Sequence, residues 1–198
     1  MNGKRFGTRL AVSILGAAML AGLTGARLLA HDGHTQAAAA QATTQKADIN
    51  ALVAVVREVT EPYKNVAVAD AAGYKLQFGC VSGPDFGAMG LHYVNFPLVI
   101  DGLIDARQPE IVIYEPAADG GVRLVGADYL VFADEWDSTH TSAPVLMGQI
   151  FHRFDAPNRF GLPAFYTLHV WAWKESPTGT FVNWHANVSC DAFTGDTN

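Results

Sequence analysis

Cysteine is scarce in this chain of 198 residues, which contains only Cys80 and Cys190. Neither belongs to a Cys-x-x-Cys-His motif, which excludes covalent haem, and their spacing fits no zinc motif. The glycine-rich stretch "GCVSGPDFGAMG" lacks the Gly-Lys-Ser/Thr ending of a phosphate-binding loop. Ser82 and Ser142 stand in no nucleophile-elbow context, so the sequence does not indicate a serine hydrolase.

Apolar runs long enough to span a bilayer are also lacking. Three basic residues precede the run "LAVSILGAAMLAGLTGA", and no acidic residue occurs before Asp32. This run is shorter than the roughly 20 residues that a membrane-spanning helix needs. The pattern is typical of a secretory signal peptide, predicted over residues 1–30 with cleavage after Ala26 or Ala30. A retained N-terminal anchor is the alternative.

Basic residues are few once the signal peptide is removed. Residues 1–30 hold four of the 13 basic residues and none of the 19 acidic ones, which leaves 9 against 19 and a net charge of −10. Such a surface repels nucleic acid and anionic membranes. We therefore expect a periplasmic or secreted protein with a small molecule or a metal ion as its partner, no nucleic acid, and no membrane contact after cleavage.

Export bears directly on the two cysteines. In an oxidising compartment, a single pair of cysteines is best interpreted as a disulfide, here between Cys80 and Cys190. It would close a loop of about 110 residues, for which the chain-entropy model gives a stabilisation of about 4–5 kcal/mol. Two buried free thiols are the alternative.

The remaining chain divides into a low-complexity segment and one folded domain. Residues 31–46 are rich in Ala, Gln and Thr and predict a flexible linker, and residues 47–198 predict a single α+β domain. Two amphipathic segments, "INALVAVVREV" and "YKNVAVADAAGY", predict N-terminal helices. Short runs separated by turn signals then predict an antiparallel β-sheet or partly closed β-barrel. The expected strands lie near 91–96, 110–115, 122–132, 145–153, 164–174 and 180–185.

Several of these strands carry a polar residue among apolar ones. Because side chains alternate between the two faces of a strand, His92, Glu115, Asp128 and His169 each fall in line with apolar residues. Buried carboxylates need a cation, and two histidines with a carboxylate form a common metal-ligand set. The pattern predicts a divalent metal site, iron, manganese, zinc or copper, in which Asp128 is a fourth ligand or a base. Whether such a domain is a small mononuclear metalloenzyme is left open.

Other interpretations of the same residues remain. The histidines could be core residues bonded to the backbone, Glu115 could point to water, and Asp128 could pair with an arginine. A non-catalytic periplasmic protein that binds a small apolar or aromatic ligand is the alternative function, and an envelope domain without any site is a third. The residues expected to line the ligand pocket are Tyr93, Gln149, His152, Tyr166, Trp171 and Trp173.

Four stretches also carry a resemblance. "GAMGLHYVN", "PEIVIYEP", "VLMGQ" and "LPAFYTLHVWAWK" together resemble a widespread family of exported bacterial proteins of unassigned function. The resemblance covers residues 62 to 191. It implies a single exported domain and no particular reaction.

Overall fold

A computed structural model describes residues 29–83 and 85–198 of the chain. The predicted signal peptide therefore lies outside the described residues, apart from its last two positions. The chain divides into two compact units after Ala40, and every strand lies in the second unit, Gln41–Asn198. Within the described ranges, no helix combines the length and the apolar character needed to cross a bilayer.

Helices come first in the chain. They are α1 (Leu29–Thr60), the 3₁₀ helix η1 (Glu61–Lys64) and α2 (Val66–Ala71). The α2 helix begins after Asn65, whose side chain accepts a hydrogen bond from the Ala67 amide at 3.1 Å, as an N-cap residue does. Residues 31–46 belong to α1 here, and their role as a linker stays a prediction.

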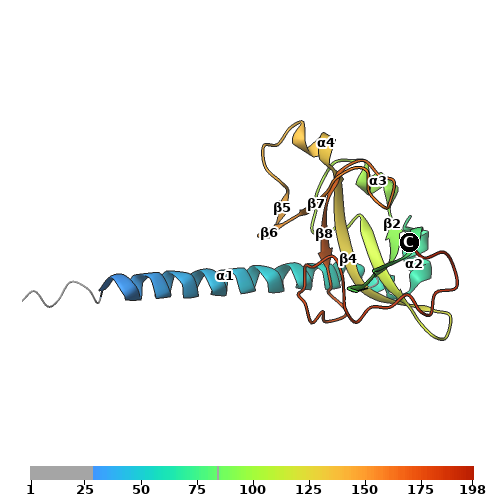
Figure 1. The fold of residues 1–198 in the computed structure, drawn as a ribbon, viewed down its shortest axis with the longest axis horizontal. Coiled ribbons are helices and arrows are strands. Elements are labelled where there is room, and N and C mark those ends of the chain that lie inside the picture. Colours follow the sequence, from blue (N-terminus) through green and yellow to red (C-terminus); the bar gives the residue numbers. More distant parts are fainter. Residues whose placement is uncertain (1–28, 84) are drawn as a thin grey trace, which may run out of the picture. The chain divides into compact units, whose positions relative to one another are not determined.

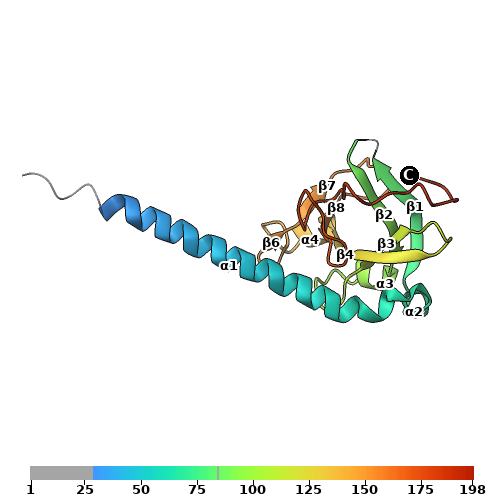
Figure 2. The same ribbon diagram turned by 90° about the horizontal axis from the view of Figure 1, so that it is seen from below.

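A six-stranded antiparallel sheet forms the body of the second unit and curls in Figures 1 and 2. In spatial order its strands are β1 (Lys75–Gly83), β2 (Gly87–Val94), β3 (Ile111–Pro116), β4 (Val122–Phe132), β8 (Phe165–Val170) and β7 (His152–Phe154). The remaining elements are the hairpin β5 (Val145–Leu146) and β6 (Gln149–Ile150) and the short helices α3 (Phe96–Val99) and α4 (Ala133–Asp137). The predicted α+β class with an antiparallel sheet is confirmed.

The sheet differs from the expected strands at three places. Residues 180–185 form no strand and contribute only a bridge between His185 and Ala88. The segment 145–153 breaks into a hairpin and β7, with Met147 in the left-handed region at φ 46°. The β1 strand was not predicted, because its glycines are typical of a loop. The strand contains a β-bulge between Gln77 and Cys80, in which Phe78 has φ 63°.

The two faces of β4 and β8 have different neighbours. One face packs against α1, whose Leu52 and Val56 are fully buried; it carries Ala127, Tyr129, Val131, Tyr166, Leu168 and Val170. The opposite face carries Asp128, Leu130, Thr167 and His169, which line a small cavity. The helix therefore buries one side of these strands, and the curl of the sheet encloses the polar residues on the other.

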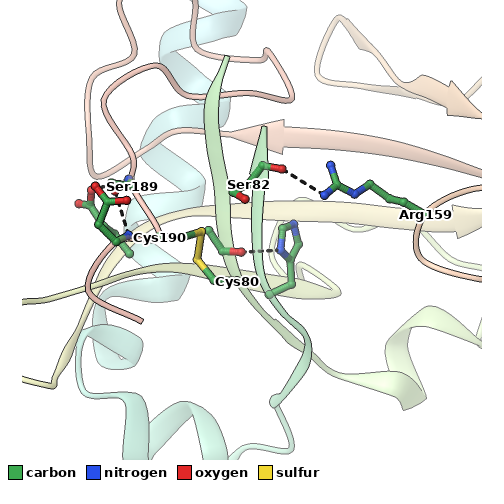
Figure 3. The surroundings of a disulfide bond; sticks show 9 residues. Cys80, Ser82, Arg159, Ser189 and Cys190 are labelled. Atoms are coloured by element: carbon green, nitrogen blue, oxygen red, sulfur yellow. Dashed lines mark hydrogen bonds between the residues drawn. A yellow bond between two sulfur atoms is a disulfide. The ribbon is translucent and has the colours of Figure 1, made fainter. Parts of the chain in front are cut away.

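The predicted disulfide between Cys80 and Cys190 is confirmed, with a sulfur–sulfur distance of 2.07 Å. It joins β1 to the C-terminal segment (Figure 3). Backbone hydrogen bonds strengthen this connection, because the Cys80 amide donates to the Asp196 carbonyl and the Asn198 amide donates to the Cys80 carbonyl. Arg159 also donates to the Ser82 carbonyl on the same strand (Figure 3). The C-terminal segment thereby covers the outer edge of the sheet.

Candidate metal centre

Three of the four predicted metal ligands meet on the concave face of the sheet. His92 lies on β2, Asp128 on β4 and His169 on β8, and each side chain is at most 5% exposed. One potential ligand atom from each lies within 4.8 Å of the other two. Asp128 and His169 are direct cross-strand partners, while His92 lies opposite Ile113 on the intervening β3. Strand register therefore brings together residues that are up to 77 positions apart.

His169 lies close to both of the other side chains of this group. His92 Nε2 lies 3.5 Å from His169 Nε2, and His169 Nδ1 lies 3.5 Å from Asp128 Oδ1. Atoms that bind one tetrahedral zinc at its usual bond lengths are about 3.3 Å apart. The two 3.5 Å distances end on different nitrogens of His169, and one ion binds only one of them; a set with one donor atom from each residue lies within 4.8 Å.

Neighbouring groups orient two of the three side chains. The Nδ1 atom of His92 lies 3.3 Å from the Gly90 carbonyl, and the Thr167 hydroxyl donates a 2.5 Å hydrogen bond to Asp128 Oδ1. Gly90 has φ 84°, and a Cβ atom there would lie 2.5 Å from the Tyr114 carbonyl oxygen, so only glycine fits. Such outer partners fix the tautomer and the orientation of metal ligands.

With Asp128 ionised and His92 protonated on Nδ1, the three side chains cannot satisfy one another without a cation. When His92 donates from Nδ1 to Gly90, its Nε2 atom presents a lone pair to His169. A neutral His169 has one ring proton. If this proton points to Asp128, the Nε2 lone pairs of His169 and His92 face each other. If it points to His92, the Nδ1 lone pair of His169 faces Asp128. His169 Nδ1 makes no ordinary hydrogen bond within the described part of the chain. Unsatisfied buried groups of this kind call for an explanation.

Burial shifts the protonation of all three residues toward neutrality. Loss of solvation, and then the neighbouring His169, lower the pKa of His92 to about 4. Loss of solvation, and then His152, lower the pKa of His169 to about 3. Loss of solvation also raises the pKa of Asp128 to about 6, against the opposing hydrogen bond from Thr167. At neutral pH both imidazoles are therefore uncharged and able to bind a metal.

A cavity of about 30 Å³ lies against the three donors. Besides the three donors and Thr167, its walls are apolar: Phe78, Met89, Ile111, Leu130, Phe154, Phe160, Leu162 and Phe165. The donors thus line a small, mostly apolar space, where the interaction between an ion and its ligands is stronger than in water.

Glu115, the fourth predicted ligand, does not join this group. Its two carboxylate oxygens each lie 2.8 Å from Lys174 Nζ, and Glu115 Oε1 also accepts a hydrogen bond from the Ser189 amide. Strand parity placed Glu115 on the correct face but could not place it along the strand. Glu115 lies four residues from Ile111, the cross-strand partner of Asp128, which is roughly 13 Å along β3.

Replacing Lys174 by methionine is expected to destabilise the protein by about 2 kcal/mol, measured by urea unfolding. Glu115 is only 9% exposed, and without Lys174 its remaining cation is Arg123, 4.0 Å away and largely exposed. The estimate is below the value for fully buried pairs because Lys174 itself is 28% exposed. The double variant with Glu115→Gln should recover part of the loss; an additive result would show that the pair is not coupled.

The residues predicted to form a ligand pocket are dispersed, and that prediction finds no support in their positions. Tyr93 contacts Tyr114, with ring centroids 4.9 Å apart, and Gln149 is buried in β6. His152 is exposed and lies 3.0 Å from Asn183. These side chains are absent from the walls of the cavity next to the metal ligands.

Tyr166, Trp171 and Trp173, the other aromatic residues of that set, donate hydrogen bonds to groups outside the centre. Tyr166 donates to Asp137 at 3.0 Å on the α1 face of β8, and Trp173 donates to Thr60 at 2.9 Å. Trp171 is the one that approaches the centre, since its ring centroid lies 5.8 Å from that of His169. Its indole nitrogen donates to the Val182 carbonyl. These aromatic residues on and just after β8 are therefore mainly part of the core.

Two residues of the centre were not predicted from the sequence. Thr167 lies two positions before His169, so the same parity that selected the histidine also places the threonine beside it. Gly90 lies two positions before His92 and provides the carbonyl that its ring contacts. The strand pattern already indicated the position of Thr167. The role of Gly90 depends on a backbone conformation that the sequence does not reveal.

Comparison with known proteins gives no match to a family model, to a curated protein or to a solved structure. The resemblance to exported bacterial proteins therefore stays a prediction.

Proposed function

We propose that this protein binds one divalent metal ion through His92, Asp128 and His169. The observation that supports this most is the convergence of three buried side chains, which each place one potential ligand atom within 4.8 Å of the other two. A divalent cation between them would accept one lone pair from each side chain. The signal peptide predicted from the sequence and the disulfide fit an exported protein with this role.

Two imidazoles and one carboxylate suit several metals. This set is the facial triad of non-haem iron proteins, and manganese and zinc use the same donors. Three protein ligands leave at least one coordination position open, as in catalytic rather than purely structural metal sites. A mononuclear centre with an exchangeable position is therefore the proposal, and the identity of the metal is for experiment to decide.

The alternative, a binding protein for an apolar or aromatic ligand, has less support. Pockets for organic ligands usually have several hundred Å³, and even benzene needs a cavity of about 150 Å³. The cavity beside His92 has about 30 Å³. A metal ion with a small additional ligand fits this space better than an aromatic molecule does.

Elemental analysis of the full chain, produced without a histidine tag, tests the proposal. After incubation with iron(II), manganese or zinc and removal of excess ion, one metal per chain is expected. The variant His140→Gln should bind equally well, because His140 is exposed and stacks on Trp136 outside the centre. The absence of any retained metal in the wild-type protein would refute the proposal.

A further inference from the structure

The cavity beside the metal centre limits what can occupy its open position. A water molecule needs about 10–15 Å³ of such space, so the cavity of about 30 Å³ holds two or three atoms of that size. The organic substrates of most metalloenzymes exceed this volume. The protein as folded therefore admits a very small molecule or none.

The protein itself offers no further strong ligand in the cavity. Among the described residues that line it, the only side-chain nitrogen or oxygen atoms belong to His92, Asp128, His169 and Thr167. The Thr167 hydroxyl already donates to Asp128 at 2.5 Å. An ion held by three ligands must therefore complete its coordination from outside the chain.

The chemistry of the walls restricts the external ligand further. Six of the wall residues besides the donors are aromatic or leucine side chains: Phe78, Leu130, Phe154, Phe160, Leu162 and Phe165. A ligand with several polar atoms would leave some of them without a hydrogen bond, at a cost of about 1–3 kcal/mol each. A diatomic molecule has only one atom beyond the metal-bound one, and it needs few hydrogen bonds from the residues that line the cavity.

We infer that the open position of the centre takes an uncharged diatomic molecule such as dioxygen or nitric oxide. This inference rests on the proposed function, because it requires a metal ion held by His92, Asp128 and His169. Size excludes larger ligands, and the apolar walls disfavour polar ones. The rings of Phe78, Phe154, Phe160 and Phe165 surround the space that the bound molecule would occupy.

Leu162 provides a way to change the size limit. Its side chain lines this cavity and also a neighbouring apolar cavity of about 20 Å³ next to α3. The residue is only partly buried and lies in the connection between β7 and β8. Shortening it to alanine should join the two cavities while leaving the metal ligands in place. Phe160→Leu, in the same connection, is a second variant that enlarges the first cavity.

The experiment uses the full chain loaded anaerobically with iron(II). Nitric oxide should convert the bound iron to a ferrous nitrosyl adduct, detected by electron paramagnetic resonance, in the wild-type protein. Imidazole, a five-membered ring, should not displace nitric oxide from the wild type but should compete in Leu162→Ala or Phe160→Leu, with an affinity at least about tenfold higher than in the wild type.

The outcomes separate the two proposals. Iron that is bound but forms no nitrosyl adduct overturns the inference and leaves the metal site intact. Imidazole that binds equally well to the wild type and to both variants also overturns it, because the cavity would then set no size limit. Failure of the wild type to retain iron, manganese or zinc overturns the proposed function itself.

Discussion

Replacing His169 by glutamine is expected to weaken metal binding by more than about 100-fold. Loss of a partner outside the ligand set already costs 10–100-fold at roughly this kind of site, and His169 is one of only three protein ligands. Glutamine is similar in size and remains polar, but it does not provide an imidazole nitrogen. Isothermal titration of the metal-free protein with zinc measures the change directly.

Stability measurements distinguish this role from that of a core histidine. With metal at 100 times its dissociation constant, the wild type should gain about 2.7 kcal/mol, whereas a 100-fold weaker variant gains only about 0.4 kcal/mol. In the metal-free protein the substitution removes only the 3.5 Å contact between His169 Nε2 and His92 Nε2 and some packing, because His169 Nδ1 makes no ordinary hydrogen bond. A large loss of metal-free stability with unchanged binding would show that His169 is structural. His140→Gln is the matched control.

The sequence predicted the components of the centre better than their arrangement. Alternation along the strands identified His92, Asp128 and His169 as polar residues on buried faces, and all three converge. The same rule also selected Glu115, which lies near the far end of β3 and pairs with Lys174. Parity determines which face a side chain occupies, but register and strand order determine which side chains meet.

The fold also contains elements that neighbouring residues in the sequence specify and elements that depend on tertiary contacts. The connection of β3 to β4 depends on local sequence, because Asp119, Gly120 and Gly121 are typical hairpin residues and Gly120 adopts φ 81° in that turn. The β1 strand could not be predicted in this way. It depends on pairing with β2 and on the C-terminal residues that cover its outer edge, both of which are tertiary contacts. Local sequence does not specify such contacts.

A third buried carboxylate, Glu110, lies just before β3 and was not singled out from the sequence. It is 2% exposed, and its Oε2 atom accepts a hydrogen bond from the Leu130 amide at 3.1 Å. The β3 strand begins only at Ile111, opposite Asp128, so the Glu110 side chain replaces a backbone acceptor for β4 at this point. Loss of solvation raises the pKa of Glu110 to about 8.

Replacing Glu110 by glutamine is therefore expected to stabilise the protein at alkaline pH. In the wild type, the folded pKa of about 8 exceeds the unfolded value of 4.5, so the folded state keeps the proton longer. Stability is fully present below about pH 4.5 and falls as pH rises through about 8, by about 3–4 kcal/mol between pH 5 and 9. Glutamine keeps an acceptor for the Leu130 amide but does not ionise.

The difference in unfolding free energy between variant and wild type, from urea titrations, should grow by that amount over the same range. Glu175→Gln, at an exposed position, should show no such change. A difference that stays constant from pH 5 to 9 would mean that Glu110 is solvated or already ionised in the folded protein.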